Sequence, residues 1–428
     1  MSWDFSTEPE FQKKLEWMGD FVREEIIPLE TVDLDRDTFD RIAQPLEEKV
    51  KEQGLWAAHL PRELGGEGFG SVRLALMHEI LGQCRYAPTL FGNQAPDAGN
   101  AELLAIGATP EQQERWMHPL LRGELRSSFS MTEPGAGADP TLLTTRAVLD
   151  GDHYVINGHK WFSSNGSNAD FLIVMVVTDP DAAPSRRASM IIVPADAPGV
   201  DIVRDISTLD RSVISEPVEN GHAEIIYRDV RVPRANLIGQ PGDGFKLAQN
   251  RLGPGRIQHA MRWIGQSQRA FDMMCERAVS RRTHGSALAD KQMVQDWIAT
   301  SAAEMQAARL LTLHAAWRID QVGPSAARLE IGMIKYWGAK VLHDVIDRSI
   351  QIHGSLGFSA DLPLEHMYRV ARGARILDGP DEVHKVSVAK QILRNYEPKD
   401  VPTEHVPTRA VAARHKFAAY LEQATANA

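Results

Sequence analysis

Two segments of the sequence combine aromatic, hydroxyl and glycine residues in a pattern suited to holding a planar ring. Residues 129–139 read FSMTEPGAGAD, and residues 158–166 read GHKWFSSNG. In the second segment, the aromatic pair Trp161–Phe162 precedes two serines, which can hydrogen-bond the edge of a ring that the aromatics stack on. A Pro-Gly turn and ordinary strand packing explain the same residues, so both interpretations stay open. The first segment lies where the composition of the chain changes, and such junctions favour ligands.

A carboxylate near the end of the chain is a second candidate for chemistry. Residues 375–384 read RILDGPDEVH. Asp378 could act as a general base, but an Asp-Gly-Pro sequence before a helix is also a good N-cap. Asp381 is interpreted as a charge in the first turn of that helix, where the helix dipole favours an anion. Arg281, taken by itself, is interpreted as a solvated surface charge.

Composition limits the classes of protein that the chain can represent. The 428 residues are 43% hydrophobic and 24% charged, which excludes a mostly disordered chain. The formal net charge of −10 argues against a nucleic-acid partner, which needs a basic face. The two cysteines, Cys84 and Cys275, cannot form a disulfide framework or a CxxC metal pair. We therefore expect no metal site and a reducing compartment.

Targeting signals and membrane spans are not apparent either. The N-terminus has no basic segment followed by an apolar core, and the run Phe171–Val177 is far shorter than the roughly 20 residues that cross a bilayer. We expect no membrane insertion and a cytoplasmic protein, with the mitochondrial matrix as the alternative.

The hydrophobic pattern divides the chain into helical, β and helical regions. Helical spacing dominates to about Leu125, with a helix over 39–54, another over 71–84 and a cap at Thr109–Pro110. Short β-like runs follow, and long amphipathic helices begin near Gly244. One of these helices is expected to start at Pro324–Ser325 and to stop at Gly354. The sequence predicts an α+β fold with boundaries at 1–127, 128–240, 241–396 and a tail at 397–428. The alternating strands and GxGxxG motif of a Rossmann domain are missing, so any flavin must be held another way.

Several motifs together carry a family resemblance. MTEPGAG at 131–137, NGHKWFSSNG at 157–166 and QIHGSLGF at 351–358 resemble the acyl-CoA dehydrogenase family, supported by LPRELGGEGFG at 60–70 and RDVRVP at 228–233. The resemblance extends from the N-terminal helices to about Arg394. It implies an N-terminal α-helical domain, a central β-barrel-like domain and a C-terminal four-helix bundle. It also implies FAD, bound between the β domain and the bundle.

The resemblance assigns roles to residues around that FAD. In one subunit, the residues that match flavin contacts are Phe129, Met131, Thr132, Gly137, Phe162 and Ser164, with Ser164 near flavin N5. The residues that match contacts to the ADP half, in a site shared across a dimer, are Arg281, Thr283, Gln292, Gln351, Gly354 and Glu382. The resemblance therefore implies a homodimer or homotetramer.

On the substrate side, the resemblance implies an acyl-CoA thioester. Arg256 matches an arginine near the CoA, and Gly379 follows the position of the base. Ala138 stands where the family often has Ser, and Gly253 where it often has Asp, so these contacts depart from the family pattern. The base position holds Asp378, where most of the family has Glu; the alternative base position is Gly255, which has no side chain. We expect burial against the flavin and the acyl chain to raise the pKa of Asp378.

The runs RLGPGR at 251–256 and DGPDEVH at 378–384 resemble one branch of the family, found fused to a kinase-like domain in animals. The resemblance implies α,β-dehydrogenation of an acyl-CoA, with electrons passed to an electron-transfer flavoprotein. Elimination or rearrangement of a 4-phosphoacyl-CoA is the alternative within this branch. An oxidase and a DNA-binding flavoprotein on the same scaffold are the remaining alternatives.

Overall fold

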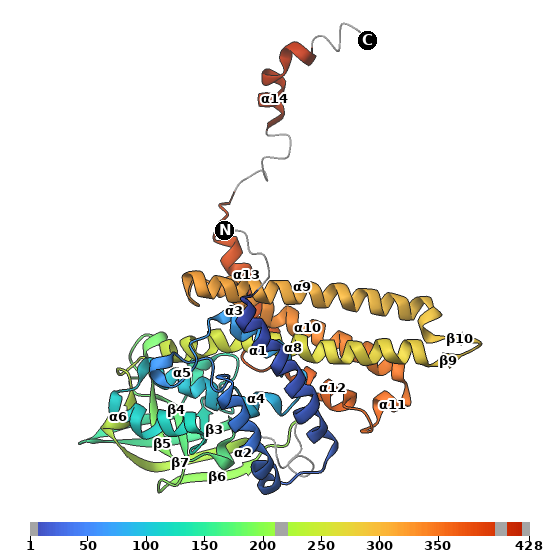
Figure 1. Ribbon diagram of the computed structural model, residues 1–428. Helices are drawn as coiled ribbons and strands as arrows, with labels where there is room; N and C mark the ends of the chain where they lie inside the picture. The colour runs from blue at the N-terminus through green and yellow to red at the C-terminus, as the bar shows by residue number, and fades with distance from the viewer. Residues whose placement is uncertain (1–6, 210–220, 399–408, 422–428) are drawn as a thin grey trace. The chain divides into compact units, whose positions relative to one another are not determined.

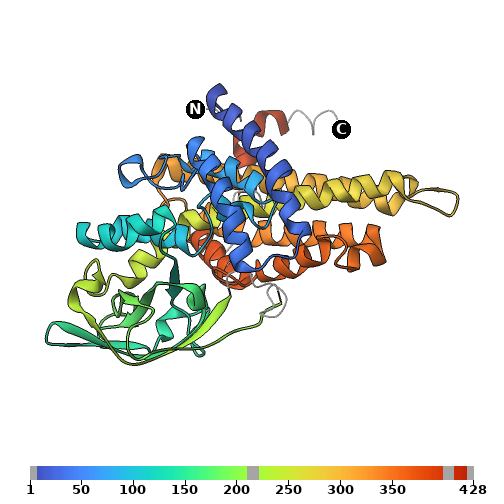
Figure 2. The same cartoon turned by 60° about the horizontal axis from the view of Figure 1, so that its bottom comes forward.

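The computed structural model describes residues 7–209, 221–398 and 409–421. The chain forms two compact units, residues 1–385 and residues 386–428. In the first unit a helical region comes first, a sheet follows, and long helices come last (Figures 1 and 2). The predicted order of helical, β and helical regions is therefore confirmed.

The N-terminal region consists of helices packed around an apolar core. In α2, Phe39 and Ala43 lie one turn apart on the buried face, as an amphipathic pattern predicts. The predicted cap is confirmed, because the Thr109 hydroxyl accepts a hydrogen bond from the Gln112 amide at 3.3 Å and Pro110 starts the helix. The helices are α1 (Pro9–Phe21), continued by turns at Val22–Ile26 and Ile27–Thr31, α2 (Arg36–Glu52), α3 (Ser71–Leu81), α4 (Ala87–Leu90), α5 (Asp97–Gly107), α6 (Pro110–Gln112) and α7 (His118–Arg122).

The middle region is one eight-stranded sheet in the order β6-β7-β3-β1-β4-β5-β8, with β2 off this path. The apolar run that the sequence singles out forms β4, which is buried almost throughout because both of its faces are covered. The strands are β1 (Ser127–Ser130), β2 (Arg146–Asp150), β3 (His153–Ser164), β4 (Phe171–Val177), β5 (Ala188–Pro194), β6 (Val200–Asp205), β7 (His222–Pro233) and β8 (Leu237–Ile238).

The sheet splits between β3 and β4. β1 pairs with the last residue of β3, Ser164, whereas β2 pairs with the first five residues of β3, 153–157. Both strands also pair with β4, at its two ends. The stretch 158–163 of β3 consequently has no strand on this edge, and the chain that connects β1 to β2 takes that place.

The C-terminal region is dominated by three long helices, α8 (Gly244–Ser280), α9 (Gln292–Val322) and α10 (Arg328–His353). Between α8 and α9 lies a small hairpin, β9 (Arg282–Thr283) with β10 (Ser286–Ala287), and α10 is followed by α11 (Ser355–Phe358), α12 (Leu364–Gly373) and α13 (Asp381–Leu393). The predicted stop at Gly354 is confirmed, with a left-handed φ of +65°. The predicted start at Pro324–Ser325 is wrong: these residues form a turn, and α10 begins at Arg328.

The second unit contains the end of α13 and a short helix, α14 (Ala410–Lys416), within the predicted tail. Among the described helices of the chain, none combines the length and the apolar character needed to cross a membrane.

Candidate active site

A buried ion pair fills the split in the sheet. Lys160 Nζ of β3 lies 2.9 Å from Glu133 Oε1 and donates a hydrogen bond to the Met131 carbonyl at 2.7 Å. Lys160 is fully buried and Glu133 is 3% exposed. The Glu133 carboxylate also accepts hydrogen bonds from the backbone amides of Thr144 at 2.7 Å and Thr145 at 2.9 Å. These contacts replace the ladder that β3 lacks at this edge.

The same pair fixes the loop that follows β1. Two backbone carbonyls of the loop are held by β3: Met131 accepts from Lys160 Nζ, and Thr132 accepts from the Trp161 amide at 3.1 Å. Burial lowers the pKa of Lys160 to about 8. Burial alone would raise the pKa of Glu133, but the adjacent ammonium and the threonine hydrogen bonds outweigh it and lower that pKa to about 2. Both groups are therefore charged at neutral pH.

A β-bulge in β3 presents an aromatic ring beside this loop. The β3–β7 pairing shifts between Lys160 and Ser163, so that Trp161 and Phe162 together lie opposite Glu224. Phe162 has a left-handed φ of +51° and a 40% exposed side chain, whereas a phenylalanine ordinarily avoids both. The bulge therefore turns this ring outward beside the loop of Met131 and Thr132.

The residues around the bulge fit a flavin. The exposed Phe162 ring offers a stacking surface, and Met131 and Thr132 are partly exposed next to it. Open space surrounds the Cα atoms of Gly135 and Gly137, where added Cβ atoms would meet no neighbour. The combination of an apolar platform and a polar loop edge is what a planar heterocycle requires. Ala138, the predicted substrate contact in the same loop, is exposed.

Arg251 of α8 joins the three regions of the first unit. Its guanidinium carbon lies 4.1 Å from the centroid of the Phe129 ring in β1, and its Nε donates to Asn100 Oδ1 of α5 at 3.2 Å. Phe129 thus carries an arginine on one face of its ring. The nearby Glu102 does not compensate this cation at neutral pH, because burial raises the pKa of Glu102 to about 8.

Asp378 lies in a strained loop that other residues hold in place. Its φ is +55° and that of the following Gly379 is +97°, both left-handed. The Asp378 carbonyl accepts hydrogen bonds from Arg256 and from His384, each at 3.1 Å. The N-cap interpretation of Asp378 is wrong, because α13 begins three residues later at Asp381 and an N-cap requires extended backbone.

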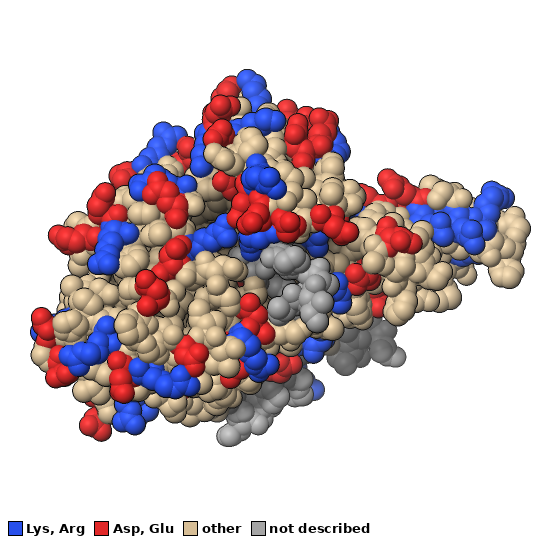
Figure 3. Space-filling model, turned by 90° about the horizontal axis from the view of Figure 1, so that it is seen from below, with Lys and Arg blue, Asp and Glu red and all other residues tan. Residues whose placement is uncertain are grey.

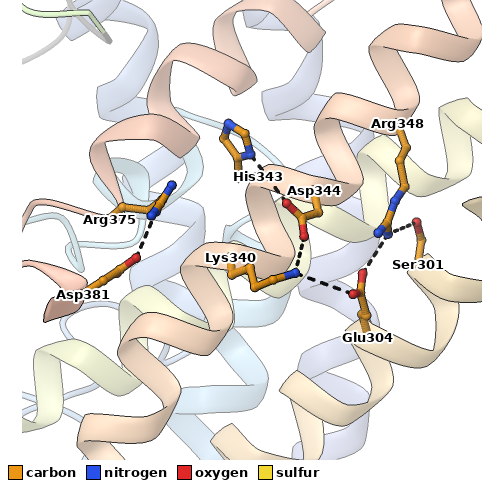
Figure 4. Close-up of polar contacts among 8 residues, drawn as sticks. All are labelled: Ser301, Glu304, Lys340, His343, Asp344, Arg348, Arg375 and Asp381. Atoms are coloured by element: carbon orange, nitrogen blue, oxygen red, sulfur yellow. Dashed lines mark hydrogen bonds and ion pairs between the residues drawn. The ribbon is translucent and has the colours of Figure 1, made fainter. Parts of the chain in front are cut away.

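The neighbours of this loop are also tied by charged groups. Asp381, in the first turn of α13 as predicted, is buried and pairs with Arg375 at 2.9 Å (Figure 4). Lys335 of α10 is 1% exposed, and its Nζ donates to the Ala374 carbonyl at 2.7 Å. These contacts hold both sides of the loop, so the Asp378 carboxylate has a defined position.

Cations surround the Asp378 carboxylate. Burial raises the pKa of Asp378, but His259, Arg256, Arg251 and Lys335 together lower it further, so the net shift is downward. The predicted upward shift concerns Asp378 buried against the flavin and the acyl chain, so it stays a prediction. His259 Nε2 lies 3.4 Å from Asp378 Oδ2, yet burial lowers the pKa of His259 to about 4, so this imidazole is neutral at pH 7.

The cluster holds more positive than negative charge. Arg251, Arg256 and Lys335 face one carboxylate, and the Arg256 Nε is buried without a hydrogen-bond partner. Uncompensated buried cations and unpartnered buried N–H groups are costly unless a ligand supplies the missing anion. The arrangement can therefore bind an anionic group next to the Asp378 carboxylate.

A second set of predicted residues lies at one end of the long helices. Ala278, Val294 and Ile352 pack in one small core, which brings together the neighbouring hairpin and the end of α10. The predicted residues at this end are Arg281, Gln292, Gln351 and Gly354, all exposed, and the partly exposed Thr283. Figures 1 and 2 show the β9–β10 hairpin at the end of the helices away from the sheet. The chain therefore brings these residues to each other but not to Phe162. Glu382 is exposed on α13.

The helices of this region are fastened by a polar network. Arg348 of α10 pairs with Glu304 of α9 at 2.7 Å and donates to Ser301 at 3.0 Å (Figure 4). Lys340 also lies 3.8 Å from Glu304.

On the surface, acidic and basic side chains are interspersed over the face drawn in Figure 3. Among the described residues, no group of three or more His, Cys, Asp or Glu is arranged to hold a metal ion.

The sequence missed five charged or polar residues of the site: Glu133, Lys160, Arg251, His259 and Lys335. A signal was present for two of them, because Lys160 adjoins the aromatic pair Trp161–Phe162 and Lys335 follows the apolar Ile334 in the region of predicted amphipathic helices. A lysine at such a position has to be buried with a partner or extended to the surface. His384, in the same motif as Asp378, is also buried, and its Nε2 lies 3.1 Å from the Asp378 carbonyl oxygen.

Comparison with known proteins relates the chain to one family throughout. Models of the N-terminal, middle and C-terminal domains of acyl-CoA dehydrogenases match residues 8–124, 128–212 and 242–393. The Mycobacterium tuberculosis protein named "Probable acyl-CoA dehydrogenase FadE2" is 42% identical over 391 residues, which are 88% of this chain and 93% of that protein.

Longer relatives and a solved structure agree with this match. "Acyl-CoA dehydrogenase family member 11" of Rattus norvegicus is 41% identical over 358 residues, which are 83% of this chain but 45% of that protein. The chain thus spans less than half the length of this relative. A solved structure from Mycobacterium abscessus superimposes with a TM-score of 0.86 at 36% identity, covering 92% of this chain and all of that one.

Proposed function

The chain belongs to the acyl-CoA dehydrogenase family, and we propose that it oxidises an acyl-CoA to the trans-2-enoyl-CoA with Asp378 as the base that removes the α-proton. Family membership supports an oxidoreductase that uses a flavin. The observation that carries the finer proposal is the position of Asp378. Its carboxylate is 31% exposed, on a left-handed residue whose carbonyl is held by Arg256 and His384. Strain that the surroundings maintain is typical of catalytic residues.

The charges around Asp378 suit the start of the reaction. Arg256, Arg251 and Lys335 keep the carboxylate ionised at neutral pH, so it can accept a proton. A carboxylate with a low pKa is a weak base in water. A bound acyl chain would exclude water from the exposed side of Asp378 and thereby raise its pKa toward that of an effective base.

We propose FAD as the flavin, held by the loop of Met131 and Thr132 and by Phe162 and Ser164. The fit of these residues to a planar ring supports this assignment. Bound FAD would accept the β-hydride and pass its electrons to an electron-transfer flavoprotein. This chain would contribute the platform, fix the loop through the Glu133–Lys160 pair, and orient the ring next to the substrate.

The ADP half of the FAD is proposed to bind to a second subunit. Arg281, Gln292 and Gln351 lie together at the end of the bundle away from the sheet. They cannot reach a flavin seated on Phe162 of the same chain in this arrangement. A homodimer or homotetramer, in which one subunit offers Arg281 to the FAD of the other, accounts for both sets of residues.

A second candidate function follows from the excess of cations. Arg251, Arg256 and Lys335 outnumber the single carboxylate among them, and Arg256 Nε has no partner. An acyl-CoA with an anionic substituent, such as a 4-phosphate, would supply the missing charge. Asp378 would again remove the α-proton, the 4-phosphate would leave with the electron pair of its C4–O bond, and the β-hydrogen would move as a hydride to C4. The product would be the 2-enoyl-CoA with no net oxidation, in place of simple dehydrogenation.

Anaerobic titration of the flavin-loaded protein tests both candidates. Unsubstituted acyl-CoAs of increasing length and a 4-phosphoacyl-CoA are added while the oxidised-flavin absorbance is recorded. We expect bleaching by the preferred thioester, and we expect Asp378→Asn to slow it by about 10² to 10⁴-fold with the flavin still bound. Asp201→Asn, the same change at an exposed carboxylate of β6, is the matched control.

The outcomes separate the candidates. Bleaching by unsubstituted thioesters supports the dehydrogenase, and phosphate release without bleaching supports the elimination. Rapid reoxidation in air would identify an oxidase, and salt-dependent DNA binding without any bleaching would identify the DNA-binding alternative. Equal rates for Asp378→Asn and Asp201→Asn would contradict the role of Asp378 as the base.

A further inference from the structure

His222, the first residue of β7, lies beneath the aromatic ring that the bulge exposes. Beyond the bulge, the β3–β7 pairing resumes with Ser163 opposite Ala223 and Ser164 opposite His222. Residues directly opposite each other in a sheet project from the same face. Ser164 Oγ is 3.0 Å from His222 Nδ1, and the imidazole centroid is 6.1 Å from that of the Phe162 ring.

The bulge is the reason that these three side chains share a face. Phe162 is one of the two bulged residues, and its left-handed φ of +51° breaks the regular alternation of side chains along β3. Its ring consequently lies toward His222, which Ser164 also contacts. His222 is 8% exposed, so it lies below Phe162 and Ser164 and not at the surface that a ligand would contact.

The protonation of His222 Nδ1 determines whether the Ser164 hydroxyl can donate a hydrogen bond to a ligand. A serine hydroxyl has one proton to donate. If His222 Nδ1 carries a proton, it donates to Ser164 Oγ, and the hydroxyl proton is free to point away from the histidine. If Nδ1 is bare, the hydroxyl donates to it, and Ser164 presents only lone pairs to a ligand. Oxidised flavin N5 is an acceptor, so the first arrangement suits it and the second does not.

We propose that His222 is a positioning residue for the flavin, whose Nδ1–H orients the Ser164 hydroxyl to donate a hydrogen bond to N5. This inference rests on the proposed function, which places Ser164 next to N5. A donor at N5 withdraws electron density from the ring and favours its reduction. His222 therefore makes the flavin a better hydride acceptor without touching it.

The reduction potential of the bound flavin reports on this role. His222→Phe keeps an aromatic ring against Phe162 and removes both nitrogens. We expect its equilibrium constant for two-electron flavin reduction to fall about tenfold, which is a downward shift of about 30 mV. His222→Asn is the matched control, because its amide N–H can replace Nδ1–H, and we expect its potential to stay close to that of the unaltered protein.

A double-mutant cycle shows whether the effect passes through the hydroxyl. In a Ser164→Ala background, His222→Phe should cause no further shift of the potential, because the group that it orients is gone. An equal shift in both backgrounds, or no shift in either, would overturn the proposal. If His222→Phe does not fold, His222→Val, which suits a strand and has no donor, takes its place.

Failure of the proposed function gives a different result. If the unaltered protein binds no flavin, or its flavin is not reduced by any thioester, then the proposed function is wrong. If the unaltered protein is a thioester-reducible flavoprotein and Ser164→Ala lowers the potential while His222→Phe does not, only the role of His222 is wrong. Flavin dissociation constants measured on the same variants separate a loss of cofactor from a change in its potential.

Discussion

A buried cluster of charge in the sheet and a partly buried one between the helices differ in how their charges are compensated. The sheet cluster pairs one cation with one anion, Lys160 with Glu133, and the carboxylate also accepts two backbone amides. The helical cluster places Arg251, Arg256 and Lys335 around Asp378. The further carboxylate that acts on Lys335, Asp381, is already paired with Arg375. The first cluster is balanced by the protein itself, and the second is not.

The difference indicates what each cluster is for. A buried pair whose hydrogen bonds are complete holds its surroundings rigidly, which suits a loop that supports a cofactor. A cluster with excess charge costs free energy until an anion arrives, which suits a ligand site. The Glu133–Lys160 pair thus stabilises the protein at the Met131–Thr132 loop, whereas the excess positive charge around Asp378 destabilises it until an anion binds.

The largest expected effect comes from removing the lysine of the balanced cluster. Lys160→Met leaves the Glu133 carboxylate buried without its cation, and we expect the free energy of unfolding to fall by about 3–5 kcal/mol. Denaturant unfolding of the protein measures this change. Arg231→Met, which breaks the exposed pair with Asp150, is the control, with an expected loss of about 1 kcal/mol or less. The double variant Lys160→Met/Glu133→Gln should recover part of the loss, and no recovery would show that the charge of Glu133 is not the cause.

As the pH falls, the two clusters lose their contributions to stability in different pH ranges. The folded pKa of Glu133 is lowered from 4.5 to about 2, so its contribution to stability is complete above pH 4.5 and is lost as the pH falls toward 2. At about 1.4 kcal/mol per pKa unit, Glu133 contributes about 3 kcal/mol in total to the free energy of unfolding. The folded pKa of His259 is lowered from 6.5 to about 4, so the unfolded chain gains a proton first, and stability falls between pH 6.5 and 4. Partial exposure of His259 reduces this effect to about 1 kcal/mol.

Two variants assign these windows. Denaturation midpoints are measured at pH 7.5, 5 and 3.5 for the unaltered protein, His259→Gln and Glu133→Gln. We expect His259→Gln to lose less stability than the unaltered protein between pH 7.5 and 5. The deficit of Glu133→Gln should not shrink over that interval, because loss of the carboxylate lowers the pKa of Lys160 further, and it should shrink at pH 3.5. A deficit of Glu133→Gln that shrinks already at pH 5 would contradict the assignment.

The smallest expected effect sharpens the comparison most directly, because it repeats the first substitution in the other cluster. Lys335, like Lys160, is buried and donates to a backbone carbonyl. Lys335→Met removes that hydrogen bond, but it also removes one of three uncompensated cations. We expect the two effects to offset each other to within about 1 kcal/mol in the ligand-free protein. Equal losses for Lys160→Met and Lys335→Met would remove the distinction between the clusters.

The sequence by itself determined the order of the domains and the family. Hydrophobic period, turn residues and caps are local properties, and they predicted β4, the Thr109 cap and the stop at Gly354. The local prediction of a helix start at Pro324 was wrong, because Pro324 lies in a turn and α10 begins later, at Arg328. Motifs such as the one around Asp378 indicated candidate residues, because the residue types and the spacing of a motif can be read without knowledge of the surrounding structure.

Only the tertiary structure decided how those residues behave. The cations that lower the pKa of Asp378 come from α8 and α10, far from it in the sequence, and no residue near Asp378 in the sequence indicates them. Glu133 meets Lys160, and Ser164 meets His222, because the sheet splits at one point and bulges at another. Electrostatic and hydrogen-bond energies depend on distances of a few ångströms in space. Spacing along the chain does not set those distances; the packing of strands and helices does.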